Sequence, residues 1–122
     1  MTLQKNVPHS VSTVPGPQSL AFFEAEQEFL SPGIQRIAQL SRITMSHGEG
    51  AILVDVDGNR YVDFFAGVTV ASLGHAHQDL ITALEEQLRK LMVGSFTTEN
   101  RAKLLELIAS LTPGDLTKTQ LY

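Results

Sequence analysis

The pattern of apolar and polar positions predicts a β-hairpin in the middle of the chain. Residues 51–56 form an apolar, β-branched run, and residues 60–65 form a second strand-like run. Asp57, Gly58 and Asn59 stand between them. Because glycine accepts the positive φ of a tight turn, two such runs around an Asp-Gly pair are typical of a hairpin, here over residues 51–65.

Three other segments carry apolar residues at the helical spacing of three and four. They cover residues 19–30, about 78–92 and about 98–111. The apolar stripe of the second segment is Leu80 or Ile81, Leu84, Leu88 and Leu91, and that of the third is Leu104, Leu105, Ile108 and Leu111. We therefore expect three helices.

The remaining segments are less regular. Residues 1–17 hold three prolines and few apolar groups, which predicts a flexible N-terminal arm. Within residues 34–46, the spacing of Ile34, Ile37 and Leu40 fits either a short helix or a packed extended segment, and residues 43–45 could start a strand. Residues 66–73 are apolar but small, as in a buried loop or the wall of a site, and residues 118–122 resemble the start of a strand.

Composition and charge narrow the class of protein. Of the 122 residues, 43% are hydrophobic and 18% are charged, which is typical of a globular chain. The net charge is −4 without a cluster of Lys or Arg, so we expect no nucleic-acid partner. The absence of cysteine excludes disulfides and thiolate sites. No stretch resembles a signal peptide or a membrane span, and we expect a cytoplasmic protein without membrane contact.

Four acidic or amide side chains in the hairpin have the spacing of a calcium loop. They are Asp55, Asp57, Asn59 and Asp63, at positions 1, 3, 5 and 9 of the register. The register fails at position 6, where Arg60 replaces the glycine of the sharp turn, and at position 12, where Ala66 replaces the bidentate glutamate. The pattern therefore favours the hairpin, and we expect no metal site.

His75 and His77 are the other candidate metal ligands. Two histidines with no cysteine or further histidine nearby cannot complete a tetrahedral shell, so we expect them to bind backbone groups at a helix start. The sequence has no Gly-x-Ser-x-Gly or Ser-x-x-Lys motif, and residues 48–50 lack the third glycine of a dinucleotide-binding turn. Local chemistry therefore assigns no catalytic, cofactor-binding or metal-binding residue.

Six features, taken in order, resemble the class III aminotransferases. They are residues 48–64 (GEGAILVDVDGNRYVDF), 66–68 (AGV) and 74–77 (GHAH), the helix with Gln87, Lys90 and Leu91, and residues 95–99 (SFTTE) and 111–116 (LTPGDL). These enzymes use pyridoxal phosphate, have fold type I and include 4-aminobutyrate, ornithine and acetylornithine aminotransferases. In the family the Gly-His-x-His phrase usually continues with proline, where this chain has Gln78. Glutamine can also occupy the first turn of a helix, so we expect the same fold.

The resemblance implies an α/β fold that forms the N-terminal portion of a fold type I transferase. This portion comprises a β-hairpin of the small domain, two helices and the first strand leading into the large domain. The resemblance also implies the cofactor pyridoxal 5'-phosphate, an amino-acid-type amino donor, a 2-oxo acid and a homodimer. The family's phosphate loop and cofactor-binding lysine follow the part matched here, so residues 18–122 are expected to be a truncated segment. Lys90, Lys103 and Lys118 match surface positions, and we assign no catalytic lysine.

Three residues carry over from the family as substrate-lining positions. Val68 matches a position in the substrate channel, and Phe96 and Thr97 match a turn that approaches an active site built from both subunits. We therefore expect an aminotransferase whose N-terminal part, taken alone, is inactive. The alternative is a non-catalytic dimerisation or interaction module, in which the apolar helix faces at 80–91 and 104–111 bind a partner.

Overall fold

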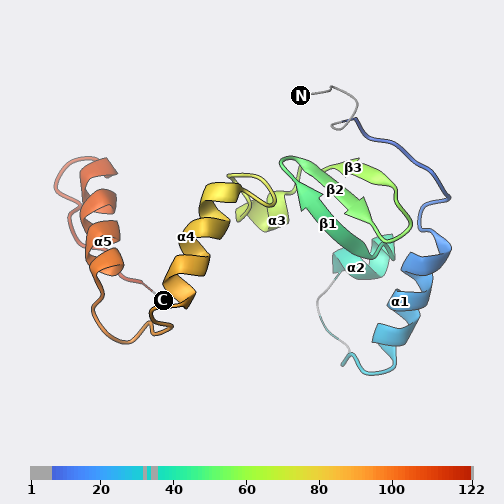
Figure 1. Cartoon of the computed structure of the whole chain (residues 1–122), viewed down its shortest axis with the longest axis horizontal. Helices are drawn as coiled ribbons and strands as arrows, with labels where there is room; N and C mark the ends of the chain where they lie inside the picture. Colours follow the sequence, from blue (N-terminus) through green and yellow to red (C-terminus); the bar gives the residue numbers. More distant parts are fainter. Residues whose placement is uncertain (1–6, 32, 34–35, 122) are drawn as a thin grey trace. The chain divides into compact units, whose positions relative to one another are not determined.

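The computed structural model describes residues 7–31, 33 and 36–121, which group into two compact units (Figure 1). The first unit is Met1–Ala83 and the second is Leu84–Tyr122. The first contains a small sheet with short helices, and the second contains the end of one helix and the whole of another.

A three-stranded antiparallel sheet forms the centre of the first unit (Figure 1). Its strands are β1 (Met45–Glu49), β2 (Ile52–Asp55) and β3 (Arg60–Val62), in that spatial order. The hairpin predicted over residues 51–65 is confirmed as β2 and β3, with Leu53 opposite Tyr61. Strand β1 belongs to the segment whose structure the pattern left open, and it pairs with β2 across a turn at Gly50.

The carboxylate of Asp55 organises the hairpin turn. Its Oδ1 accepts the backbone N–H groups of Asp57 (3.0 Å) and Asn59 (2.8 Å). Its Oδ2 accepts the Asn59 side-chain amide (2.8 Å) and the Tyr61 hydroxyl (2.6 Å). Asp55 and Asn59 are both buried, so these bonds replace the water that both groups lose. The carboxylate meets four donors, and the turn has one preferred conformation.

The same contacts shift two pKa values in opposite directions. Burial raises the pKa of Asp55, but the hydrogen bonds from Tyr61, Asn59 and Asp57 outweigh it and hold the pKa below its usual range. Burial, the hydrogen bond to Asp55 and the charge of Asp55 raise the pKa of Tyr61 to about 12. The folded chain therefore favours an ionised Asp55 beside a neutral Tyr61.

The hairpin turn also binds the segment that precedes the first helix. Asn59 Oδ1 accepts the backbone N–H groups of Val11 (2.8 Å) and Ser12 (3.0 Å). His9 exchanges two backbone hydrogen bonds with Arg60, at 3.1 and 2.7 Å. The stretch over residues 9–12, which precedes helix α1, is thus hydrogen-bonded to the hairpin. The division into an arm over 1–17 and a segment over 18–122 stays a prediction.

Asp57 caps helix α1 (Pro17–Gln27) from the hairpin. Its two oxygens accept the N–H groups of Gln18 (2.9 Å) and Ser19 (2.8 Å), which have no partner within the first helical turn. The N-cap residue is Gly16, and a Cβ there would overlap the Asp57 side chain. The helix predicted over 19–30 thus begins earlier, at a proline in the first helical position, and ends earlier, at Gln27.

Apolar packing contributes little to the first unit. Ile52 is the only buried apolar residue in the part of the chain that the structure describes. Helix α2 (Arg36–Ser41) realises the short-helix alternative for its segment and has no buried residue, and Ile34 lies outside the described residues. Polar contacts around the hairpin turn therefore hold this unit together.

Two helices of more than ten residues follow the sheet in the sequence. Helix α4 (Gln78–Leu88) begins where predicted and ends before Met92, and helix α5 (Glu99–Leu111) confirms the segment predicted over 98–111. Thr98 is the N-cap of α5, and its hydroxyl accepts the Arg101 N–H at 3.2 Å. Residues 118–121 form no strand, because a strand requires a neighbour for its ladder of hydrogen bonds and none of the described residues supplies one. Tyr122 lies outside the described residues.

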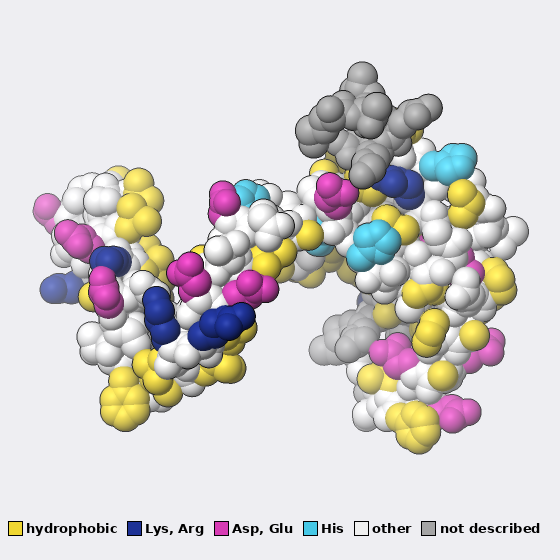
Figure 2. Space-filling model, viewed as in Figure 1, with side chains coloured by type: hydrophobic (Ala, Val, Ile, Leu, Met, Phe, Trp, Pro, Cys, Tyr) yellow, Lys and Arg dark blue, Asp and Glu magenta, His cyan; other side chains and the backbone are white. Residues whose placement is uncertain are grey.

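Apolar side chains remain exposed on the helices of the second unit, as the yellow surface in Figure 2 shows. They include part of both predicted stripes, namely Leu84, Leu88, Leu91, Leu104 and Leu111, and also Leu107, which belongs to neither stripe. Within the described residues, no helix combines the length and the apolar character that crossing a membrane requires.

We predict that Asp55→Ala lowers the free energy of unfolding by about 3 kcal/mol, because the buried Asn59 and the part-buried Tyr61 hydroxyl lose the acceptor that Asp55 provides. Urea unfolding followed by circular dichroism measures the change. The exposed acid Glu24 provides the control, since Glu24→Ala removes the same charge but no such contact. An Asp55→Ala chain with an unchanged urea midpoint would contradict the role given to this carboxylate.

We predict that Thr98→Ala lowers the stability of helix α5 by about 1 kcal/mol, because the Arg101 N–H loses its cap. Thr98→Ser keeps a hydroxyl at the same position and is expected to retain most of the stability. The helix signal at 222 nm as a function of temperature distinguishes the variants. Equal melting of the alanine and serine variants would show that the cap is not formed.

Candidate functional site

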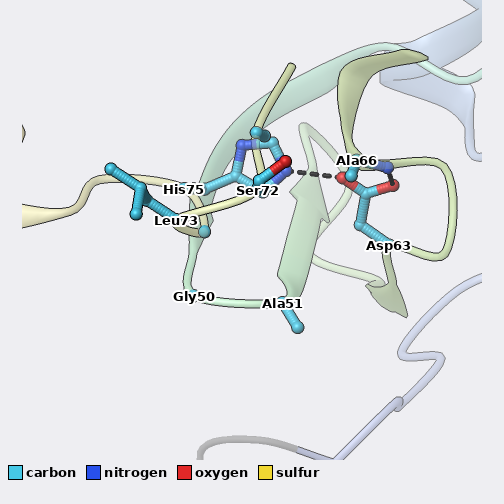
Figure 3. A pocket seen from close by; sticks show the side chains of 9 residues that line it. Gly50, Ala51, Asp63, Ala66, Ser72, Leu73 and His75 are labelled. Atoms are coloured by element: carbon cyan, nitrogen blue, oxygen red, sulfur yellow. Dashed lines mark hydrogen bonds and ion pairs between the residues drawn. The ribbon is translucent and has the colours of Figure 1, made fainter. Parts of the chain in front are cut away.

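Asp63 and His75 form a close pair beside the sheet. His75 Nε2 lies 2.6 Å from Asp63 Oδ2, with the side chains 25% and 6% exposed (Figure 3). Because a carboxylate only accepts, Nε2 carries the proton. The hydrogen bond from His75 holds the pKa of Asp63 below its usual range against the effect of burial, and the N–H groups of Ala66 and Phe65 act in the same direction. Asp63 is therefore a carboxylate in the folded chain.

The backbone around His75 is fixed by the sheet. His75 and Gly50 exchange two backbone hydrogen bonds of 2.8 and 2.9 Å. The imidazole ring lies against Gly48, where a Cβ would come within 2.7 Å of the His75 ring. Gly74 has a φ of +88°, and a Cβ there would come within 3.0 Å of Gly50. The glycines of the 48–50 and 74–77 phrases thus permit a close approach between the β1–β2 turn and the loop before α4.

The other oxygen of Asp63 holds the start of a left-handed turn. Oδ1 accepts the N–H groups of Phe65 (2.9 Å) and Ala66 (2.8 Å). The next element, α3 (Ala66–Thr69), has positive φ at all four residues: 47° at Ala66, 60° at Gly67, 64° at Val68 and 68° at Thr69. Left-handed helix costs a residue with a Cβ about 1–2 kcal/mol, so the surrounding contacts must impose this turn.

A cavity of about 300 Å³ lies beside the Asp63–His75 pair (Figure 3). It is lined by Gly50, Ala51, Asp63, Ala66 and residues 71–75. Ala66 and residues 71–73 therefore form part of the wall of a cavity, which is one of the two predicted alternatives, whereas the buried loop is wrong because no residue of the 66–73 segment is buried. Ser72 Oγ donates to the Thr69 carbonyl at 3.3 Å, so it is not engaged as a nucleophile on His75. The pair can hold a proton between His75 Nε2 and Asp63 Oδ2, and Asp63 can orient the N–H groups that bond to it.

The substrate-lining residues named from the resemblance lie in different units. Val68 belongs to the left-handed turn of the first unit and is 63% exposed. Phe96 lines a separate cavity of about 390 Å³ in the second unit, with Val93, Gly94, Thr98, Arg101 and Leu121. Thr97 is exposed and is not among the residues that line this cavity. A role of these three residues in substrate binding stays a prediction.

Most of the candidate metal ligands are occupied by other contacts. Asp55, Asp57 and Asn59 bind backbone and side-chain donors around the hairpin turn. His75 Nε2 binds the Asp63 side chain, and His77 Nδ1 is buried without a partner among the described residues, so neither nitrogen makes the predicted backbone contact. Among the described residues, no group of three or more His, Cys, Asp or Glu side chains is placed to hold a metal ion.

In the sequence, Asp63 and His75 belong to two unrelated patterns. Asp63 is part of the spacing of a calcium loop, and His75 is a candidate metal ligand together with His77. Asp63 and His75 lie on either side of the small-residue segment 66–73. Their hydrogen bond brings the two ends of this loop together.

We predict that the chain loses stability at both ends of the pH range. The pKa values of Asp55, Asp57 and Asp63 lie below their usual range, so their contribution is present above about pH 4 and is lost as the pH falls through the folded-state values. Tyr61, whose pKa rises to about 12, contributes below about pH 10, and this contribution is lost as the pH rises towards 12.

Urea midpoints measured across the pH range provide the check. Asp63→Asn removes one of the three depressed carboxyls, so its acid limb is expected to be shallower than that of the unsubstituted chain. An acid limb of unchanged slope would contradict the assignment for Asp63.

Comparisons with known proteins place this fold. A profile of the family Aminotransferase class-III matches residues 35–121. The chain is 34% identical over 109 residues to an alanine/serine racemase of Pyrococcus horikoshii, covering 87% of this chain and 23% of the relative. It is 36% identical over 94 residues to an acetylornithine aminotransferase of Methanothermobacter thermautotrophicus, covering 75% and 23%.

Solved structures agree. The crystal structure of an omega-transaminase from Sphaerobacter thermophilus matches 81% of this chain and 23% of its own with a TM-score of 0.71 and 29% identity. An acetylornithine aminotransferase from Elizabethkingia anophelis matches 76% and 24% with a TM-score of 0.65 and 27% identity. The chain thus spans about a quarter of the length of these relatives. With its small antiparallel sheet and its helices, the chain belongs to the class III aminotransferase family and has the fold of part of these enzymes.

Proposed function

We propose that this chain is the N-terminal part of a pyridoxal-phosphate-dependent aminotransferase that moves an amino group from an amino-acid-type donor to a 2-oxo acid. Relatives with this activity in their names support the proposal. They include acetylornithine aminotransferases and the 5-aminovalerate aminotransferase of Pseudomonas aeruginosa, which is 35% identical over 88 residues. Two other relatives are named as a racemase and an epimerase, and a transamination assay separates these reaction classes.

The described residues do not fit a pyridoxal phosphate site. A covalent site needs a lysine in a cavity, but Lys103 is 68% exposed and pairs with Glu99 on the surface of α5. Lys90 and Lys118 are also exposed, and the cavities beside Asp63 and Phe96 are lined by other residues. Asp63 faces a cavity, but both of its oxygens are bonded within the chain. In our proposal the cofactor is therefore held by parts of the enzyme outside these residues.

The chain's own contribution is the shape of the substrate site. The exposed Val68 side chain stands on a turn whose backbone is held by Asp63, and the exposed Phe96 stands beside a second cavity. We assign both residues, with Thr97, to the lining of the substrate site in a homodimeric enzyme. The observation that carries the proposal is the family match over residues 35–121.

A second candidate function rests on the exposed apolar stripes of α4 and α5. In this alternative the chain is a non-catalytic module that dimerises or binds a partner through them. Sedimentation at low concentration discriminates, because a compact, monodisperse species favours the module and an aggregating or partly unfolded chain favours the enzyme segment.

We predict that the 122-residue chain, mixed with pyridoxal phosphate, N-acetylornithine and a 2-oxo acid, forms no amino acid and retains no cofactor absorbance after dialysis. The physical reason is that the described lysines are exposed and none lines the cavity beside Asp63 or the one beside Phe96. Amino-acid analysis and the absorption spectrum are the measurements. Turnover by this chain alone would contradict the proposal.

A complementary experiment tests the segment within a complete enzyme. Residues 36–121 replace the equivalent segment of the Sphaerobacter thermophilus omega-transaminase, and the unmodified enzyme is the control. We expect the graft to retain cofactor absorbance and transaminase activity. A graft that folds and binds the cofactor but transfers no amino group would count against the proposal.

A further inference from the structure

The turn over residues 66–69 is held by hydrogen bonds and not by packing. None of its residues is buried, and Val68 and the following Val70 are 63% and 83% exposed. Since exposed side chains cannot force a backbone into the left-handed region, the contacts that impose it must be polar. The carboxylate of Asp63, bonded to the N–H groups of Phe65 and Ala66, is the contact at the start of the turn.

Asp63 is in turn oriented by His75. Oδ2 binds His75 Nε2 at 2.6 Å, and this leaves Oδ1 directed at the turn (Figure 3). The imidazole has little freedom, because its backbone is paired with Gly50 and its ring lies against Gly48. The sheet therefore fixes His75, His75 orients Asp63, and Asp63 holds the turn.

The loop between the pair contributes further hydrogen bonds that depend on this geometry. The carbonyl of Phe65 accepts the N–H groups of Val68 (3.0 Å) and Thr69 (3.1 Å), and the carbonyl of Ala66 accepts that of Ala71 (2.9 Å). All three bonds need the left-handed turn. Their amide protons consequently report whether the turn is formed.

We propose that His75 is a positioning residue: acting through Asp63, it holds the left-handed turn of residues 66–69 and so places Val68 at the substrate. The second half of this statement rests on the proposed function, in which Val68 lines the substrate site. His75 exchanges no proton with substrate in this role. His75 contributes an N–H donor at a fixed position, and a side-chain amide at the same place can also supply an N–H group.

The test compares three variants with the unsubstituted chain. His75→Ala removes the donor, and His75→Gln keeps an N–H group that can reach Asp63. His47→Ala removes a histidine that is exposed on β1 and bonds only the neighbouring Ser46 side chain. Hydrogen exchange at constant pH is followed by NMR at the amides of Val68, Thr69 and Ala71, with amides of β2 as the internal reference for the fold.

We expect exchange at these three amides to be about tenfold faster in His75→Ala, because a hydrogen bond to a charged group is lost. His75→Gln should restore most of the protection, and His47→Ala should leave it unchanged. Exchange within twofold of the unsubstituted chain in His75→Ala would overturn the proposal, as would a failure of His75→Gln to restore protection while β2 remains protected.

A second variant covers the case in which His75→Ala unfolds the sheet. Gly48→Ala keeps both members of the pair, but its Cβ displaces the His75 ring. The proposal expects faster exchange at Val68, Thr69 and Ala71 in this variant with β2 still protected. Unchanged exchange at these amides would overturn it.

The substrate half of the proposal is tested in the grafted transaminase. We expect His75→Ala to raise the KM for the amino donor about tenfold with a smaller effect on kcat, and His75→Gln to restore it. A graft that folds and binds the cofactor but is inactive with His75 in place counts against the proposed function, while the exchange experiment still decides the positioning role. An active graft whose KM does not respond to His75→Ala overturns the substrate half alone.

Discussion

The carboxylate of Asp55 is the interaction on which the first unit depends. Its four hydrogen bonds fix the turn between β2 and β3, and this turn carries Asp57 and Asn59 at its rim. Asp57 then caps α1, and Asn59 binds residues 11 and 12. Ile52 is the only buried apolar residue described. The hydrogen-bond network around Asp55 therefore supplies the stabilisation that an apolar core supplies in most domains.

Asp63 repeats this arrangement at the other end of the hairpin. One oxygen binds two backbone N–H groups of a turn and the other binds a side chain, as with Asp55. The difference lies in the backbone that is stabilised. The turn beside Asp55 needs positive φ only at a glycine, whereas the turn after Asp63 has positive φ at three residues that carry a Cβ. Such strain persists only where surrounding contacts impose it, and it is concentrated here beside a cavity.

The exposure of its lysines and apolar stripes indicates what this segment contributes to the enzyme that we propose. The chain spans about a quarter of its relatives, and its lysines are exposed where the structure describes them. Apolar stripes on α4 and α5 are exposed as well. In the enzyme that we propose, this segment shapes the substrate site, and the parts beyond it supply the cofactor chemistry and cover the stripes.

The sequence by itself determined the elements that depend on neighbours a few residues away. The Asp-Gly turn predicted the hairpin, the apolar spacing predicted α4 and α5, and the ordered phrases predicted the family. Tertiary structure alone decided the docking of residues 9–12 on Asn59 and Arg60 and the pairing of Asp63 with His75. It also left residues 118–121 without a strand. Each of these outcomes requires a partner distant in the chain, and no local pattern of apolar and polar residues specifies which partner a hydrogen-bonding group will meet.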